Sequence, residues 1–361
     1  MQTFRLGELF AGAGGLAWGA FHAGIEPDIK IIHAWANDID SATCATYRKN
    51  ICPDNPDSII CGDVRGLNFR ILEDIDALAF GFPCNDFSVV GKRAGLNGKY
   101  GLLYQFAIKA LKIFQPDWFL AENVRGLASA NKGSAQRQIL NEFSDAGYKI
   151  FPHLYKFEEY GIPQTRHRII VVGIRNDIKK TFRPPSPVPY SNKNISSKNA
   201  LENPPIAPDV ANNEKTKQSP EVVERLKYIK PGQNAFNADL PPELQLHVKT
   251  ATFSSIYRRL DPDKPAYTVT GSGGGGTHIY HYKEPRALTN RERARLQTFP
   301  DDFIFVGSKE NVRRQIGMAV PCAGAKIIFE AVLKTFAGVD YDSVPCNVNF
   351  YNEIDLFAKE I

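Results

Sequence analysis

One cysteine lies in a sequence context that could make it a nucleophile. Cys84 follows Pro83 within the segment 82–88, directly after an apolar run that predicts a strand. Proline restricts the preceding backbone, and a thiolate held at the end of a strand could attack an electrophilic carbon. Many free cysteines are instead small buried apolar side chains. These residues alone leave both interpretations open.

An acidic and a basic segment could complete a catalytic site. Glu122 opens the segment 122–124 at the end of another predicted strand. Its carboxyl group could be a general acid or simply an acid near a helix N-terminus. Gln164, Arg166 and Arg168 directly precede a further strand-like run. Alternation along an extended chain would put these three side chains on one face, either toward a substrate or as a solvated basic edge.

A glycine-rich turn and two carboxylates could bind a nucleoside. The turn, residues 12–15, lies between a predicted strand and a predicted helix, and Ala17 fits the last position of a loose dinucleotide-binding pattern. Glycine permits positive φ and close approach of the backbone to a ligand. Asp38 and Asp63 end the next two predicted strands, and a carboxylate at the position of Asp38 can accept ribose hydroxyl groups. The three corners together favour a nucleoside-containing cofactor, although such a turn also occurs in α/β proteins without a ligand.

The elements that must position these residues alternate along the chain. Strands alternating with helices predict a parallel sheet with helices on both faces, and ligands bind at the carboxyl ends of such strands. Two more helices are expected near the end of the chain, the first capped by Thr289 or Asn290. Apolar runs and spacing predict strands over 4–10, 29–35, 58–61, 77–80, 118–121 and 169–174, and helices over 103–114, 290–297 and 323–336.

The composition is that of a globular protein. The chain has 361 residues, enough for two or three domains, with 43% hydrophobic and 23% charged residues. These values exclude a wholly disordered, collagenous or coiled-coil chain, and the net charge of +5 permits a polyanionic partner. No secretory signal and no unbroken apolar run of about 18–20 residues is visible. The six cysteines lack the spacing of a zinc or redox motif, so reduced thiols in the cytoplasm are expected.

The amino-acid composition changes after the last predicted strand. Residues 184–242 carry 11 of the 24 prolines, and a glycine tract occupies 271–276. Such a stretch is loop-rich and poor in regular helix. It predicts a second domain or a long insertion rather than a core strand–helix unit.

In their order along the chain, these segments closely resemble the motifs of the DNA cytosine-5 methyltransferase family. The similarity covers about residues 1–175 and 255–336, and the order and spacing of six motifs argue against a chance match. The matching segments are Phe10–Gly15, Pro83-Cys84 with Phe87-Ser88, Glu122–Val124, Gln164 with Arg166 and Arg168, Arg286–Pro300, and Gly317–Pro321.

The resemblance implies an α/β fold with two parts. One is a Rossmann-like S-adenosylmethionine-dependent methyltransferase sheet, formed by residues 1–178 and 314–361. The other is a smaller, loop-rich target-recognition domain over 179–313.

The resemblance also implies the reaction, methyl transfer to carbon 5 of a cytosine that is flipped out of DNA. Cys84 would add to carbon 6 as a thiolate, and Glu122 would protonate or hydrogen-bond ring nitrogen 3. Arg168 would hold the ring oxygen, while Arg166 would support the pocket and its charge.

The implied methyl donor is S-adenosylmethionine, and no metal is expected. His278 and His281 are interpreted as surface or DNA-facing residues. The expected cofactor-binding residues are Phe10, Ala11, Gly12, Ala13, Gly15, Asp38, Ile39, Asp63, Val64, Leu103 and Ala319. The expected DNA-binding residues are Ser88, Lys92, Arg93 and Thr268, and candidate readers of base edges are Arg258, Arg259 and Lys249.

Four positions depart from the family pattern. Phe82 and Asn85 replace the usual Pro and Gln around the nucleophile, and Asp38 replaces the usual Glu at the ribose. Met318 stands where the family usually has Asn, and loss of that amide could weaken a hydrogen bond near the cofactor.

Double-stranded DNA is the expected partner of a monomeric enzyme without a membrane span. A restriction endonuclease would be its genetic partner, without a physical complex. Methylation of transfer RNA and an inactive DNA-binding homologue are the alternatives. A nicotinamide oxidoreductase would explain the glycine turn but not Cys84, Glu122 and Arg168.

Overall fold

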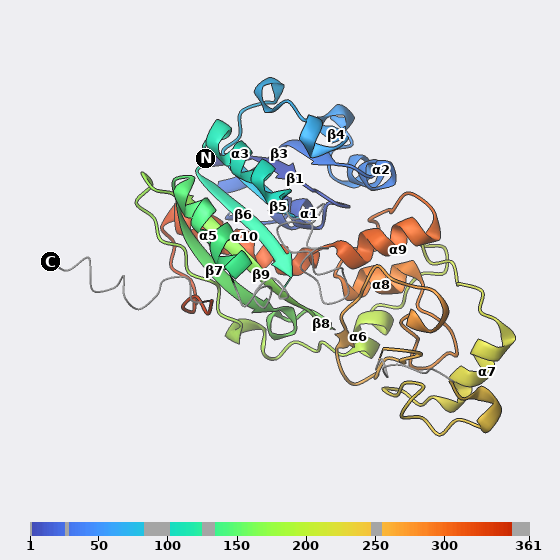
Figure 1. Ribbon diagram of the computed structural model, residues 1–361. Coiled ribbons are helices and arrows are strands. Elements are labelled where there is room, and N and C mark those ends of the chain that lie inside the picture. Colours follow the sequence, from blue (N-terminus) through green and yellow to red (C-terminus); the bar gives the residue numbers. More distant parts are fainter. Residues whose placement is uncertain (1, 26–28, 83–101, 125–133, 247–254, 349–361) are drawn as a thin grey trace.

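A computed structural model describes residues 2–25, 29–82, 102–124, 134–246 and 255–348 (Figure 1). Five residues with expected roles lie outside the described residues, namely Cys84, Ser88, Lys92, Arg93 and Lys249.

Eight of the described strands form one mixed sheet in the order β2-β3-β1-β5-β6-β9-β7, with β4 paired to β3. The neighbours among β1, β3, β4, β5 and β6 pair in parallel, whereas β2, β9 and β7 pair antiparallel with their neighbours. The prediction of a parallel sheet is therefore confirmed for its centre and wrong at β9 and β7. The strands are β1 (Gln2–Leu9), β2 (Gly24–Ile25), β3 (Ile29–Asp38), β4 (Ile59–Cys61), β5 (Ala77–Gly81), β6 (Trp118–Val124), β7 (Tyr148–Lys156) and β9 (His167–Arg175).

The nine-residue strand β7 has no counterpart among the predicted strands. It lies at the edge of the sheet, pairs with β9 and contains Pro152. Proline is tolerated in an edge strand because one side of that backbone has no ladder partner. The same proline makes the segment look unlike a strand in the sequence.

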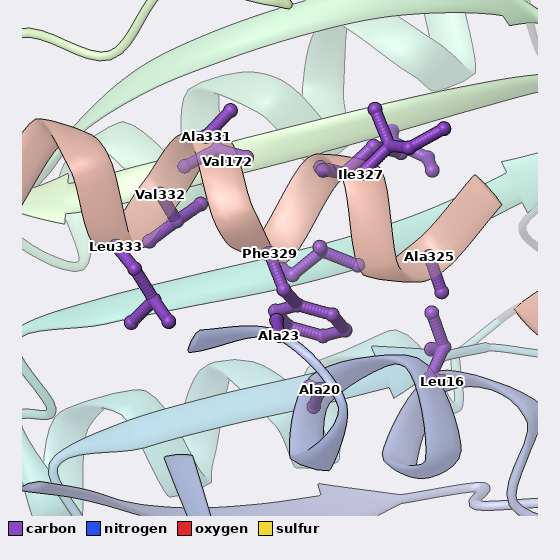
Figure 2. Close-up of a cluster of buried hydrophobic side chains, with 14 of the residues drawn as sticks. Leu16, Ala20, Ala23, Val172, Ala325, Ile327, Phe329, Ala331, Val332 and Leu333 are labelled. Atoms are coloured by element: carbon purple, nitrogen blue, oxygen red, sulfur yellow. The ribbon is translucent and has the colours of Figure 1, made fainter. Parts of the chain in front are cut away.

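Helices cover both faces of the sheet, as predicted. On one face α1 and α10 pack together, with Leu16, Phe329 and Val172 of β9 in a shared apolar cluster (Figure 2). On the other face α3 and α5 contribute Leu111 and Phe143 to a second cluster. The helices that frame the sheet are α1 (Gly15–Phe21), α2 (Ser41–Asn50), α3 (Tyr104–Phe114), α5 (Ser134–Asp145) and α10 (Cys322–Ala337). Short 3-10 turns occur at Pro56–Ser58, Val64–Gly66, Phe69–Ile71, Phe157–Tyr160, Val188–Tyr190, Pro242–Leu244 and Gly275–Thr277.

The stretch Lys309–Ala337 is long and apolar enough to cross a membrane by length and composition. In the structure it consists of two helices, α9 (Lys309–Met318) and α10, and 72% of its most apolar 18-residue segment is buried. Such burial is typical of a helix in a protein core, and α10 indeed packs against α1 and the sheet.

The region after β9 is rich in loops. It contains α6 (Ser197–Glu202), α7 (Pro220–Tyr228) and α8 (Asn290–Leu296). The predicted start of α8 is confirmed, because Thr289 and Glu292 form a capping box there.

A small parallel sheet joins β10 (Ala266–Tyr267) to β8 (Gln164–Thr165). An apolar cluster also links the two parts of the chain, because it contains Ala13 and Cys322 together with Val269. The boundary predicted between 313 and 314 falls inside α9, and the domain division stays a prediction.

Candidate active site

The carboxyl ends of the central strands gather the expected site residues at one edge of the sheet. Asp38 pairs in register with Cys61, and Gly81 pairs with Glu122. The carbonyl oxygen of Phe82 accepts a hydrogen bond from the side-chain amide of Asn123 at 3.3 Å. The chain therefore enters the segment that carries Cys84 beside Glu122 and Asn123, since Phe82 is the last described residue before it.

Glu122 and Arg168 form an ion pair at this edge. Oε1 of Glu122 lies 2.8 Å from Nε of Arg168, and the side chains are 11% and 13% exposed. The pairing follows from the antiparallel register of β6 and β9, which places Val124 opposite Arg168. The two atoms are in ion-pair contact, but their alignment is poor for a hydrogen bond. A carboxyl group and a guanidinium thus share one small, mostly buried space.

Arg166 lies fully buried behind this pair. Its guanidinium donates to the carbonyl oxygens of Val269 at 3.0 Å, Gly317 at 3.1 Å and Ala319 at 2.8 Å. Burial lowers the pKa of Arg166, and nearby Arg168 acts in the same direction. The solvated-edge interpretation is therefore wrong for Arg166, whose donors hold three backbone segments together.

Gln164 is buried beside Arg166 and extends the same network. It donates to the side chain of Gln297 at 2.8 Å and accepts from the Val269 amide at 2.7 Å. Gln297 donates in turn to the carbonyl oxygen of Ile316 at 2.7 Å. The sequence placed Gln297 within a motif without giving it this role, which no local pattern reveals.

The glycine-rich turn is held against the end of β3. One carboxylate oxygen of Asp38 accepts from the Gly12 amide at 2.9 Å, and the other accepts from the Asp40 amide at 2.9 Å. Burial raises the pKa of Asp38, and these backbone donors oppose the rise. Gly12 has a φ of 58°, a left-handed value that favours glycine. Ile39 is largely exposed beside Asp38.

Two other expected cofactor residues meet at the start of α1. A Cβ on Gly15 would lie 2.6 Å from the carbonyl oxygen of Val320 and 3.3 Å from the Cβ of Ala319. Glycine at 15 therefore lets the turn after α9 approach α1, and Ala13 is buried in the same region. The structure brings residues from the two ends of the chain to one corner.

The remaining expected cofactor residues lie on the neighbouring strand ends. Phe10 and Leu103 pack against the same apolar cluster, in which Val64 is buried. Ala11 is also buried, and its amide donates to the Asn37 carbonyl oxygen at 3.0 Å. Asp63 pairs with Arg65 and caps the turn that follows it. The cofactor contact expected of Asp63 stays a prediction.

Thr268 lies close to the base-pocket residues. Its hydroxyl donates to the carbonyl oxygen of Thr165 at 2.7 Å, directly after β10. Arg258 is half-buried with its guanidinium 4.5 Å from the centre of the Tyr267 ring. Both residues belong to the loop-rich region after β9.

Arg259 does not read base edges, contrary to the prediction. It is buried, and its guanidinium donates to backbone carbonyl oxygens of five residues, with distances between 2.6 and 3.4 Å. Burial lowers its pKa. Its acceptors come from two separate segments, so Arg259 fastens α7 to the chain after His281. The acceptors are Leu226, Ile229, His281, Tyr282 and Glu284.

The interpretation of His278 and His281 as surface or DNA-facing residues is also wrong. Their exposed fractions are 7% and 6%, and burial lowers both pKa values, that of His278 to about 4. Nδ1 of His281 accepts from the Lys283 amide at 2.9 Å. Within the described ranges no group of three or more His, Cys, Asp or Glu side chains could hold a metal ion.

Met318 is 65% exposed at the end of α9. The turn beyond it is held by Arg166 and Gln297, which both donate to the carbonyl oxygen of Ala319. Met318 therefore lies at the surface, and the buried side chains of Arg166 and Gln297 fix the backbone next to it.

A buried acid on β1 escaped the sequence interpretation. Glu8 accepts a hydrogen bond from the Tyr47 hydroxyl at 3.0 Å, and burial raises the pKa of Glu8 to about 8. The signal was a glutamate among the apolar neighbours Leu6, Leu9 and Phe10.

Known proteins resemble the chain over almost its whole length. It is 56% identical to the type II methyltransferase M.BbvI of Brevibacillus brevis, across 97% of this chain and 96% of that protein. It is 39% identical to M.NgoFVII of Neisseria gonorrhoeae, across 98% of this chain and 92% of that one. A crystal structure of a prophage-encoded E. coli protein shares the fold, with a TM-score of 0.70, 24% identity and coverage of 92% and 99%.

The family model described as C-5 cytosine-specific DNA methylase matches residues 4–334. This range includes the sheet, the Glu122–Arg168 pair, Arg166 and the turn after α9. The chain therefore belongs to the C-5 cytosine-specific DNA methylase family.

Proposed function

We propose that the protein methylates carbon 5 of a cytosine within a specific sequence of double-stranded DNA, using S-adenosylmethionine. The observation that carries the proposal is the Glu122–Arg168 ion pair at the edge of the sheet where the Cys84 segment begins. Its relatives are named type II methyltransferases, which supports DNA as the substrate.

Carbon 5 of cytosine is a poor nucleophile until carbon 6 is attacked. The Cys84 thiolate forms a bond to carbon 6, and the electron pair of the 5,6 double bond moves toward carbon 5 and the ring. Glu122 protonates or hydrogen-bonds nitrogen 3, where negative charge would otherwise build up. After methylation water accepts the proton from carbon 5, the 5,6 double bond re-forms and Cys84 departs as a thiolate, while any proton on nitrogen 3 returns to Glu122.

Arg168 can serve two purposes in this site. Its guanidinium orients the Glu122 carboxyl group, and its remaining donors suit the ring oxygen of cytosine. Its positive charge would also favour the Cys84 thiolate over the thiol. Arg166 acts through the backbone that it holds, so it is a positioning residue.

The residues at the glycine corner fit a nucleoside-containing methyl donor. The Asp38 carboxylate retains lone pairs for ribose hydroxyls, and the exposed side chain of Ile39 can cover an adenine ring. When bound, S-adenosylmethionine supplies an electrophilic methyl group on a sulfonium. Asp38 is one methylene shorter than the glutamate that is usual in the family. The glycine-rich turn compensates for this shorter reach, because the Gly12 amide binds the same carboxylate.

We assign DNA recognition to residues 179–313 and catalysis to 1–178 and 314–361. Thr268 would touch the DNA backbone near the flipped base. Ser88, Lys92 and Arg93 would contact phosphates from the segment after Cys84. The protein would act on cytoplasmic DNA as a monomer. Its gene would accompany that of a restriction endonuclease, and methylation would protect the host DNA from cleavage.

The decisive experiment offers DNA and transfer RNA to the protein with labelled methyl donor. Label is expected in DNA, and label in RNA alone would refute the DNA assignment. Cys84→Ala should abolish transfer, whereas the matched variant Cys346→Ala should retain it. Equal inactivity of the wild type and Cys84→Ala would favour a DNA-binding protein without catalysis. Bisulfite sequencing of plasmid DNA from expressing cells would then identify the methylated sequence.

A further inference from the structure

Two buried arginines lie beneath the segment Thr270–Gly274. Arg293 of α8 is 1% exposed and Arg313 of α9 is 9% exposed. Arg313 donates to the carbonyl oxygen of Gly273 at 2.8 Å, and Arg293 donates to that of Thr270 at 3.4 Å. A Cβ built on Gly273 would lie 2.3 Å from Nε of Arg313, so the guanidinium packs directly against this backbone.

The charges of these arginines are poorly neutralised by the protein. Among the described residues, Nε and Nη2 of Arg293 and Nε of Arg313 have no hydrogen-bond acceptor. Glu292 is the carboxylate whose charge acts on Arg293, but its two oxygens lie 2.7 and 2.8 Å from the guanidinium of Arg286. Burial lowers the pKa of Arg293 to about 10, and the like charge of Arg313 acts in the same direction. Arg293 nevertheless remains charged at neutral pH.

An uncompensated pair of buried cations is unfavourable in the free protein. The same pair stabilises an anion that binds nearby, because the positive charges are already in place and the site need not reorganise. The two arginines therefore suggest that the segment above them receives a negative group.

The segment exposes hydrogen-bond donors on its outer side. Because the carbonyl oxygen of Gly273 points toward Arg313, the amide of Gly274 in the same trans peptide points away from it. A Cβ on Gly274 would meet no atom within 4 Å, so this position is open. The exposed hydroxyl groups of Thr270 and Ser272 lie 2.8 Å apart beside it.

We propose that Thr270–Gly274 binds one phosphodiester group of the DNA duplex, over a fixed positive charge supplied by Arg293 and Arg313. The site rests on the proposed function, since it takes DNA as the substrate. The phosphate would accept hydrogen bonds from the two hydroxyls and the Gly274 amide. The arginines would hold the carbonyl oxygens of the segment inward, so that its donors face the phosphate. Their positive charge would also attract the phosphate.

The test measures DNA binding against salt for Arg313→Met and Arg293→Met. The probe is a fluorescent duplex that contains one site methylated by the wild type, as mapped by bisulfite sequencing. Loss of one phosphate contact should reduce the slope of log Kd against log salt by about 0.9. Affinity at low salt should fall roughly tenfold. Arg313→Lys should retain most of the slope, because it keeps the charge.

Thermal stability separates this role from a structural one. Removing a buried, uncompensated charge should leave the melting temperature equal to or above that of the wild type while DNA affinity falls. Lys112→Met is the matched control, because Lys112 is exposed in the last turn of α3, at the end remote from the active edge. It should change neither quantity.

A scan with single neutral methylphosphonates identifies the phosphate without depending on a variant's stability. One methylphosphonate should weaken binding by the wild type and have little further effect on Arg313→Met. An unchanged salt slope in both methionine variants, or equal sensitivity of wild type and variant to every methylphosphonate, would overturn the site. Failure of the wild type to bind or methylate DNA in the same assay would instead reject the proposed function.

Discussion

Replacing Glu122 by glutamine separates its chemical role from its structural one. The carboxyl group contacts Arg168 at 2.8 Å, and both side chains are nearly buried. Removing one partner of a buried ion pair outright costs about 3–5 kcal/mol, because the other charge is left unpaired. Glutamine keeps an oxygen at this contact, so Glu122→Gln should lower the free energy of unfolding by only about 1–2 kcal/mol. The melting temperature should fall by a few degrees.

The effect on catalysis should be much larger. Glutamine cannot give a proton to ring nitrogen 3, and general acid catalysis contributes about 10²–10⁴-fold. The barrier should therefore rise by about 3–5 kcal/mol. Single-turnover transfer of labelled methyl groups, with enzyme in excess over DNA, measures this step without interference from product release.

Asp117→Asn is the matched control for this comparison. Oδ1 of Asp117 lies 3.2 Å from Nη2 of Arg175, directly before β6 and therefore at the end of that strand opposite to Glu122. It should show a similar small loss of stability and a rate close to that of the wild type. A Glu122→Gln rate above about a third of the wild-type rate would refute the acid role of Glu122.

Three further predictions follow from other contacts of the fold. Asp38→Asn should weaken S-adenosylmethionine binding roughly tenfold or more, because a charged acceptor for ribose is lost; calorimetric titration measures this, and unchanged affinity would remove Asp38 from the cofactor site. Arg259→Met should lower the free energy of unfolding in urea titrations by about 1–3 kcal/mol for each buried carbonyl oxygen that is left without a donor, whereas Arg258→Met should cost far less. Folded Glu8 holds its proton up to a pKa of about 8, against 4.5 in the unfolded chain; its contribution to stability is therefore complete below pH 4.5 and declines by roughly a few kcal/mol as pH rises to 8. Glu8→Gln should flatten that pH dependence, and parallel curves for the two proteins would contradict it.

Features encoded by local sequence were predictable. The turn at 12–15 needs glycine because Gly12 and Gly14 have positive φ, and the start of α8 follows from Thr289 and Glu292 three residues apart. In both cases the partners lie within a few residues of each other. Local preference and final structure therefore agree.

Features that depend on distant partners were not predictable. Arg258 and Arg259 are adjacent, yet one stacks on Tyr267 and the other is enclosed by carbonyl oxygens near Leu226 and His281. Which arginine is buried depends on how segments more than 20 residues away fold over it. His278 and His281 were misplaced for the same reason.

Arg166 shows how recognition and catalysis are joined in this fold. Its guanidinium binds Val269, next to the proposed DNA-contacting Thr268, and also Gly317 and Ala319, beside the proposed cofactor corner. Two residues along the chain, Arg168 contacts Glu122. A shift of the recognition segment must therefore stretch hydrogen bonds that also fix the base pocket and the turn after α9. Arginine suits this position because its planar fork can bind several carbonyl oxygens at once, which the single ammonium of lysine cannot do with the same geometry.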